Sequence, residues 1–371
     1  MSNYNIYRQI AERTQGNIYI GVVGPVRTGK STFIKRFMDL LVIPNIENEY
    51  DKERARDELP QSATGRTIMT TEPKFVPNEA IKIVLDENAQ LKVRLIDCVG
   101  YLVKGALGYL EDNAPRMVST PWFDHPIPFE EAAEIGTRKV INDHSTIGLL
   151  VTTDGSITEI PREEYVDAEK RVVNELKSIN KPFIIVLNSV RPFANETLKL
   201  KEELEQKYDV PVVNVNVAQM RIEDINNIME KILFEFPVSE IGINLPEWID
   251  ALESSHWLRS KLMNIIKDMF KNVKKIREVK EVLSSLEGID VIKKAYIERI
   301  DLGYGNVSME FSTPENLFYQ VLSELTGLEI EGDRSLVSLM KELARIKKEY
   351  QRVERLTRRS EEHTSELQSH S

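Results

Sequence analysis

Residues 19–32 join an apolar segment to a glycine-rich motif, and this combination limits the folds available to the chain. Residues 24–31 read Gly-x-x-x-x-Gly-Lys-Ser. The two glycines allow backbone N–H groups to curl around phosphate oxygens. The apolar segment predicts a strand, and the apolar spacing that follows predicts a helix whose N-terminus favours an anion. The motif therefore predicts an α/β P-loop nucleoside triphosphatase (NTPase) of the GTPase-like, doubly wound type.

The residue types in this motif predict which groups contact a nucleotide. Lys30 would reach the β- and γ-phosphates, and Ser31 would ligate Mg²⁺. Asp97 ends a second apolar segment and would hold the metal's water shell, while the Gly100 amide would approach the γ-phosphate. The predicted metal-binding residues are Ser31 and Asp97. The predicted nucleotide-binding residues are Gly24, Pro25, Val26, Arg27, Thr28, Gly29, Lys30, Ser31, Thr32, Gly100 and Asn188.

A polar loop at residues 62–73 lies between these two motifs and could close over the nucleotide as a switch. Thr70 or Thr71 would sense the γ-phosphate and Mg²⁺; the alternative is an ordinary threonine-rich loop before a strand. Lys30, Asp97, Thr70 and Thr71 are the predicted catalytic residues. Tyr101 stands where small GTPases often carry a glutamine that orients water, so water must be positioned otherwise or hydrolysis is slow. Possible charge stabilisers are Arg27, Arg66 and Arg116.

The segment after the apolar run 183–187 predicts which base is recognised. A GTPase normally has Asn-Lys-x-Asp here, and its aspartate accepts two hydrogen bonds from guanine. This chain has Asn188-Ser189-Val190-Arg191, so the required carboxylate is replaced by an arginine. Loss of a bidentate, charge-assisted contact removes guanine selectivity. ATP is therefore the expected nucleotide.

Alternating apolar patterns from about residue 17 to 236 predict one α/β domain. Strands are expected at 18–23, 81–85, 93–96, 146–152, 183–187 and 210–215, and helices at 162–178, 196–208 and 222–234. The strands at 81–85 and 93–96 are expected to form a hairpin. The predicted domains are an ATPase domain at 1–238, a middle α+β domain at 239–334, the start of a C-terminal domain at 335–358, and a tail at 359–371.

The pattern changes after residue 237. Residues 245–286 predict one amphipathic helix, packed on a core or lying on a membrane surface. A hairpin at 295–311 and a helix at 314–325 follow. Residues 335–358 carry a heptad-like apolar stripe without an evident partner. The tail has no apolar period and resembles a translated sequencing adapter, so it is excluded from the fold.

Composition restricts the class of protein and its compartment. The formal net charge of -10 argues against general nucleic-acid binding, which requires a basic surface. Cys98 is the single cysteine, so an internal disulfide and a cysteine zinc site are excluded, as expected for a reducing compartment. The N-terminus lacks the apolar core of a signal peptide, and no uninterrupted apolar run is long enough to span a bilayer. We expect a cytosolic chain with at most peripheral membrane attachment.

Several further segments resemble the stage IV sporulation protein A family. The resemblance runs from about residue 3 to 358 and includes the unusual loop 101–143. Family members continue further, so a C-terminal domain is expected to be missing here. The segments that carry the resemblance are residues 24–31, 54–62, 67–77, 97–101, 121–124 and 151–157.

The resemblance implies an ATPase in the cytoplasm of the sporulating mother cell, located at the outer forespore surface. By that resemblance, ATP hydrolysis with Mg²⁺ drives self-polymerisation into the basement layer of the bacterial spore coat. A small amphipathic peptide would tether the protein to the membrane, and other spore coat proteins would be recruited. Two alternatives stay open: a regulatory GTPase, and a scaffold that binds nucleotide without turnover.

Overall fold

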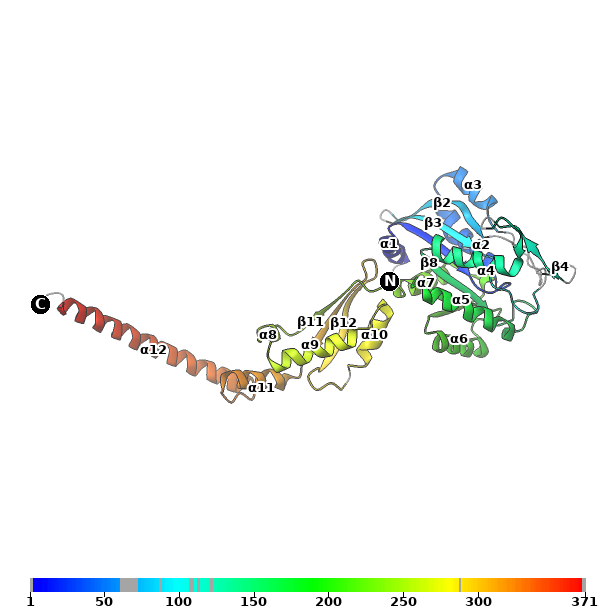
Figure 1. Ribbon diagram of the computed structural model, residues 1–371. Coiled ribbons are helices and arrows are strands. Elements are labelled where there is room, and N and C mark those ends of the chain that lie inside the picture. The colour runs from blue at the N-terminus through cyan, green and yellow to red at the C-terminus, as the bar shows by residue number, and fades with distance from the viewer. Residues whose placement is uncertain are drawn as a thin grey trace. The chain divides into compact units, whose positions relative to one another are not determined.

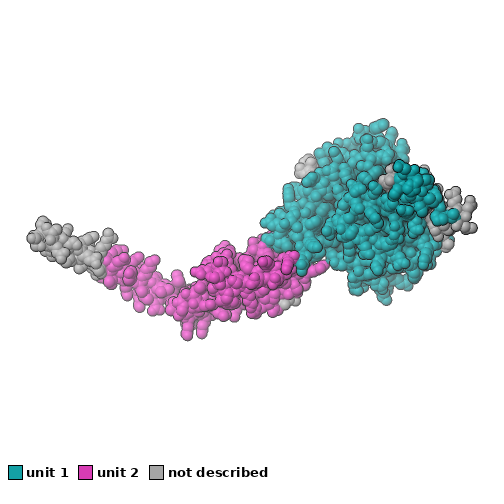
Figure 2. Space-filling view, in the orientation of Figure 1, with its two compact units in different colours: residues 1–242, 272–280, 299–307 teal, residues 243–271, 281–298, 308–371 magenta. Residues whose placement is uncertain are grey.

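The computed structural model describes residues 3–60, 73–86, 89–106, 110–111, 114–120, 123–286 and 288–368. The chain divides into two compact units, coloured teal and magenta in Figure 2. Unit 1 contains residues 1–242, 272–280 and 299–307, and unit 2 contains residues 243–271, 281–298 and 308–371. Two short segments beyond residue 242 therefore belong to the unit that holds the predicted nucleotide site.

A six-stranded sheet forms the centre of unit 1, in the order β10-β9-β8-β1-β3-β2. All neighbours are parallel except the β2–β3 hairpin at one edge. This confirms the predicted α/β class and the hairpin. The strands are β1 (Asn17–Val23), β2 (Lys74–Asp86), β3 (Ala89–Asp97), β8 (Ile147–Thr153), β9 (Phe183–Asn188) and β10 (Val212–Val215).

Apolar sequence explains why β1, β8 and β9 lie in the middle of the sheet. Every residue of β8 and β9 is buried, as expected for strands covered on both faces. In the register, Val22 of β1 pairs with Asp97 of β3, and Val23 pairs with Leu150 of β8. The carboxyl ends of three neighbouring strands therefore meet at one edge, where α/β proteins bind ligands.

Helices pack around this sheet (Figure 1). The helices predicted at 162–178, 196–208 and 222–234 are present, the first beginning with a 3₁₀ turn at Arg162–Tyr165. Helix α1 was not predicted; its Ile6, Tyr7 and Ile10 are buried. The helices of unit 1 are α1 (Asn3–Thr14), α2 (Lys30–Phe37), α3 (Glu49–Asp57), α4 (Phe129–Lys139), α5 (Val166–Ser178), α6 (Asn195–Tyr208) and α7 (Ile222–Phe234).

Residues 98–146 connect β3 to β8 and contain α4. Two small two-stranded ladders precede that helix. The first pairs β4 (Leu110–Glu111) with β5 (Ala114–Pro115), and the second pairs β6 (Met117–Val118) with β7 (Ile127–Pro128). Phe129, Ala133 and Val140 of this connection belong to the same buried core cluster as Val23 and Val26.

The predicted single helix at 245–286 is wrong, because the structure has three helices there. They are α8 (Glu247–Asp250), α9 (Trp257–Phe270) and α10 (Ile276–Ser284). His256 caps α9 by accepting a hydrogen bond from the Leu258 amide at 3.2 Å. Before α10, the Glu278 carboxylate accepts hydrogen bonds from the Lys274 and Lys275 amides at 2.7 and 3.0 Å. These caps satisfy free backbone N–H groups at the starts of the helices. They divide a segment whose apolar spacing alone predicts one continuous helix.

A second sheet has the order β11-β13-β12 and contains the predicted hairpin. The strands are β11 (Glu240–Asn244), β12 (Lys294–Asp301) and β13 (Asn306–Ser312). Helix α11 (Glu315–Thr326) follows, close to the predicted range. Helix α12 (Asp333–Gln368) contains the predicted heptad-like stripe and continues into the segment predicted as a foreign tail.

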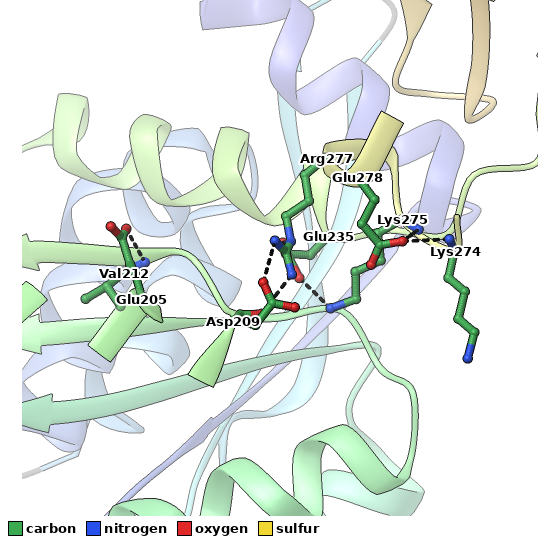
Figure 3. A network of polar contacts seen from close by, with 8 residues as sticks. All are labelled: Glu205, Asp209, Val212, Glu235, Lys274, Lys275, Arg277 and Glu278. Atoms are coloured by element: carbon green, nitrogen blue, oxygen red, sulfur yellow. Dashed lines mark hydrogen bonds and ion pairs between the residues drawn. The ribbon is translucent and has the colours of Figure 1, made fainter. Parts of the chain in front are cut away.

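A buried ionic network attaches the 272–280 segment to the rest of unit 1 (Figure 3). The Glu235 side chain is 0% exposed and lies 2.7 Å from both Lys275 Nζ and Arg277 Nε. Arg277 also pairs with Asp209 at 3.0 Å, at the end of α6. Burial raises the pKa of Glu235, and the two cations oppose that change. A segment far along the sequence is thus fixed to the ends of α6 and α7.

Candidate functional site

The phosphate-binding loop has the backbone that its sequence predicts. Gly24 has a φ of 139° and Gly29 a φ of 95°, both in the region that favours glycine. A Cβ on Gly24 would lie 2.3 Å from the Val151 carbonyl oxygen, and one on Gly29 would lie 2.4 Å from Asn188 Nδ2. Neither position can carry a side chain without displacing its neighbour. The loop therefore lies directly against β8 and the end of β9.

Lys30 lies inside the loop. It is 5% exposed, and its Nζ donates hydrogen bonds to the carbonyl oxygens of Pro25 at 2.6 Å and Gly24 at 3.3 Å. Burial lowers the pKa of the Lys30 ammonium. Because α2 begins at Lys30, the unpaired amides of the helix N-terminus lie beside this cation. A buried cation next to unpaired amides suits an anionic ligand.

Ser31 and Asp97 meet, although they lie far apart in the sequence. Ser31 Oγ donates a hydrogen bond of 2.6 Å to Asp97 Oδ2. The other carboxylate oxygen, Oδ1, is buried and has no hydrogen-bond partner among the residues that the structure describes. Burial raises the pKa of Asp97, since it penalises the charged carboxylate. A hydroxyl and a buried carboxylate with a spare oxygen fit Mg²⁺, which prefers oxygen ligands.

The segment after Asp97 packs against the loop. The Val26 amide donates a hydrogen bond to the Tyr101 carbonyl oxygen at 2.9 Å. Gly100 has a φ of 90°, and a Cβ there would lie 2.2 Å from the Gly24 carbonyl oxygen and 2.6 Å from Lys30 Nζ. The structure therefore brings the predicted residues Gly24, Lys30 and Gly100 into direct contact.

Asn188 joins the loop to the end of the sheet. Its Nδ2 donates to the Thr28 carbonyl oxygen at 3.0 Å, and its Oδ1 accepts from the Val217 amide at 3.1 Å. Both ends of the side-chain amide are therefore used within the protein. Arg191, at the position of the missing guanine-reading carboxylate, is exposed.

Comparisons with known proteins assign the family. Residues 1–237 match the family model described as "Stage IV sporulation protein A, ATPase domain", and residues 238–364 match its middle-domain model. The chain belongs to the stage IV sporulation protein A family. It is 52% identical over 353 residues to a stage IV sporulation protein A of Bacillus anthracis. It is 51% identical to one of Clostridioides difficile and 50% identical to one of Bacillus subtilis. Each alignment covers 95% of this chain and 72% of the relative.

The chain has the ATPase domain of the stage IV sporulation protein A family. At position 101 it has a tyrosine, where small GTPases often have a glutamine. Tyr101 is 1% exposed, and the Arg171 guanidinium lies 5.0 Å from the centre of its ring. Burial raises the pKa of the Tyr101 phenol well above its usual range. The side chain is part of the buried core cluster that also contains Val172 and Leu176 of α5.

Three of the other predicted residues cannot be placed, and Arg116 lies away from the phosphate-binding loop. Thr70, Thr71 and Arg66 fall in residues 61–72, outside the described part of the chain. The Arg116 guanidinium lies 5.8 Å from the centre of the Phe129 ring, next to α4. The predicted switch at residues 62–73 therefore stays a prediction.

Asp154 lies at the edge of the site, near Asn188, and was not predicted from the sequence. Asp154 Oδ1 accepts a hydrogen bond from the Ser156 amide at 2.9 Å, and the Val190 amide donates to Ser156 Oγ at 3.0 Å. Burial raises the pKa of Asp154, but hydrogen bonds from Ser156, Ser189 and Thr197 lower it more, so the net change is downward. The signal available in the sequence was an Asp-x-Ser turn directly after the buried strand β8.

Among the described residues, no helix is both long and apolar enough to cross a membrane.

Proposed function

We propose that this protein hydrolyses ATP. The observation that supports this most is the convergence of Lys30, Ser31 and Asp97, with a 2.6 Å hydrogen bond between the last two. The phosphates of ATP would accept hydrogen bonds from the loop amides and the first turn of α2. Lys30 would exchange the carbonyl oxygens of Gly24 and Pro25 for phosphate oxygens, which are stronger acceptors because they are charged.

Ser31 and Asp97 would hold Mg²⁺. When bound, Mg²⁺ supplies a Lewis acid that polarises the phosphate oxygens. Asp97 Oδ1, buried and without a hydrogen-bond partner in the described part of the chain, supports this assignment. Thr70 or Thr71 would complete the site from the switch loop and report the γ-phosphate.

We propose ATP rather than GTP as the substrate because of the residues around Asn188. The Asn188 amide bonds Thr28 and Val217, and Arg191 is exposed where a GTPase has its aspartate. Without that carboxylate, guanine loses its two charge-assisted hydrogen bonds. An arginine at this position adds no acceptor for guanine.

Membership of the family supports a role in the spore coat. We propose that ATP hydrolysis drives self-polymerisation into the basement layer around the forespore, from the mother-cell side. A small amphipathic peptide at the membrane surface and other coat proteins are the proposed partners. The net charge of -10 supports the absence of nucleic acid among them.

Side-by-side turnover of Mg²⁺-ATP and Mg²⁺-GTP tests the enzyme, with phosphate release as the readout. We expect ATP to be hydrolysed faster. A clear preference for GTP would support a regulatory GTPase instead. Tight ATP binding without phosphate release would support a scaffold that binds nucleotide without turnover. Sedimentation of a full-length relative with and without ATP separately tests polymerisation.

A further inference from the structure

The edge strands of a sheet have unpaired backbone N–H and C=O groups on one side, and proteins usually protect them. In the part of the chain that the structure describes, the two larger sheets end in β10, β2, β11 and β12. Strand β10 is four residues long, β2 contains Pro77 and two register shifts, and β11 is five residues long with Gly242 at its centre. Each of these features disfavours pairing with a further strand.

Strand β12 has none of these protections. Its eight residues include neither proline nor glycine, and among the described residues only β13 pairs with it. Lys294, Tyr296 and Glu298 are exposed, and the two residues between them are half-buried. Because successive side chains of a strand point to opposite faces, these three form one row on the exposed face of the sheet. The edge therefore presents both free backbone groups and an accessible row of side chains.

The order of charges in this row is complementary to itself. Suppose that β12 of a second copy lies antiparallel, with a two-fold axis at Tyr296. Lys294 then lies opposite Glu298 of the second copy, and Glu298 opposite its Lys294. Opposite charges directly across two strands stabilise their pairing. An axis at Ala295 or Ile297 would place Lys294 opposite Tyr296 or Ile300 instead, so both charge pairs would be lost.

The two side chains that form these pairs are held on the exposed face. Ser308 Oγ donates a hydrogen bond to Glu298 Oε2 at 3.0 Å, and Asn244 Nδ2 donates to the same oxygen at 3.4 Å. Lys294 Nζ lies 5.2 Å from the centre of the Tyr296 ring, which is itself 43% exposed. The row is thus arranged before a partner binds, which lowers the cost of ordering it.

The remaining charges near this edge do not oppose the pairing strongly. In the same register Lys293 lies opposite Arg299 of the second copy, on the other face of the sheet. Each has an acidic partner in its own copy: Lys293 Nζ lies 2.8 Å from Glu315 Oε1, and Arg299 Nη2 lies 3.5 Å from Asp301 Oδ2. These partners reduce the repulsion between the two cations.

We propose that β12 is a contact between two copies of this chain. The two strands pair antiparallel around a two-fold axis at Tyr296 and join two three-stranded sheets into one. Such a contact is isologous and closes on itself. It goes beyond the proposed function, since it requires no nucleotide and does not by itself build a polymer. A single strand pair is smaller than a standard interface of about 1,600 Å², so we expect a weak dimer, with a dissociation constant of about 10–100 µM.

Sedimentation equilibrium of the parent chain without nucleotide, from about 1 to 300 µM, measures the dimer. Lys294→Glu and Glu298→Lys each place like charges opposite each other twice per dimer. Each should therefore raise the dissociation constant at least about 10-fold. The double variant restores both opposite-charge pairs with the charges exchanged, and its dissociation constant should return to within about threefold of the parent value. Thermal unfolding checks that each variant is folded.

Lys267→Glu is the matched control, because Lys267 is exposed on α9 of the same unit and the net charge changes equally. It should leave the dissociation constant unchanged. Phosphate release should be equal in all these chains, since the nucleotide site lies in unit 1, so the contact and the proposed function have separate readouts. A parent chain that stays monomeric over the whole range would overturn the contact. Association that none of the β12 variants changes, or that the double variant fails to restore, would also overturn it.

Discussion

Lys30 and Asp97 are two buried charged residues whose ionised forms are both penalised by burial. Burial lowers the pKa of Lys30 and raises the pKa of Asp97. Such an arrangement costs stability in the absence of a ligand, and it is typical of sites that a charged substrate completes. Function rather than stability explains why these residues occupy the core.

Lys30→Ala should abolish productive nucleotide binding without unfolding the protein. The variant loses the point charge on the β- and γ-phosphates, so ATP affinity should fall at least about 10-fold. The nucleotide-free protein should keep its melting temperature, because a buried charge with a lowered pKa is removed. Isothermal titration with ATP and thermal unfolding measure the two effects. Unchanged affinity and turnover would contradict the site assignment.

Asp154→Asn should lower stability in a pH-dependent way. The folded-state pKa of Asp154 lies below its unfolded value, so the stabilisation is present above about pH 4 and is lost as the pH falls through the folded pKa. The expected loss at pH 7 is below about 1 kcal/mol, since solvent screens this partly exposed carboxylate. Urea unfolding at pH 7 and pH 3 measures it. A difference of equal size at both pH values would contradict the ionic origin.

At the scale of elements, strands were predicted best. β1, β8 and β9 are mainly apolar, and β8 and β9 are buried along their whole length, which favours strands in the middle of a sheet. Helices α9 and α10 were merged into one, because the caps at His256 and Glu278 depend on side chains whose direction apolar spacing does not show. The loop residues of the site were predictable from the motif. The burial of Tyr101 was not, since it depends on packing against α5.

Contacts between elements far apart in the sequence could not be predicted from the sequence either. Lys275 and Glu235 are 40 positions apart, and nothing in either local pattern predicts their 2.7 Å ion pair. Disruption of a buried carboxylate with two cationic partners lowers stability strongly, because removal of one member leaves the others without their partner. The network therefore offers a direct measurement of how firmly the 272–280 segment is attached.

Glu235→Ala should destabilise unit 1 by about 2–3 kcal/mol, because Lys275 and Arg277 lose their buried partner. Asp209→Asn is the control, because asparagine suits the left-handed backbone there (φ 47°); the side chain is 75% exposed, so removal of its charge should cost under about 1 kcal/mol. Urea unfolding of both variants gives the comparison. Equal effects would mean that the buried pair contributes no more than the surface pair.

At the scale of the whole molecule, α12 carries an exposed apolar stripe. Leu343, Ile346, Tyr350 and Val353 are 44%, 49%, 69% and 60% exposed and follow a heptad-like spacing. A contiguous exposed apolar surface of this kind usually marks a contact with a partner. The alignment with the Bacillus anthracis relative covers 72% of that relative's length.

We expect residues 1–358 to bind and slowly hydrolyse ATP without forming a stable ATP-dependent polymer. The phosphate site is assembled in unit 1, whereas the apolar residues of the α12 stripe are exposed. Pelleting after incubation with Mg²⁺-ATP, against a nucleotide-free sample, is the measurement. A full-length relative serves as the positive control. A robust ATP-dependent pellet from residues 1–358 would show that these domains suffice for assembly.

The two hydrogen bonds of the Asn188 side chain have an evolutionary consequence. Asn188 holds the Thr28 carbonyl and the Val217 amide whichever base is bound, whereas Arg191 lies exposed at the rim. A lineage could therefore exchange one purine for another at the rim while the asparagine, required for the shape of the loop, is retained. Retention of this asparagine in a relative would then record ancestry and loop architecture, and would say nothing about which nucleotide that relative consumes.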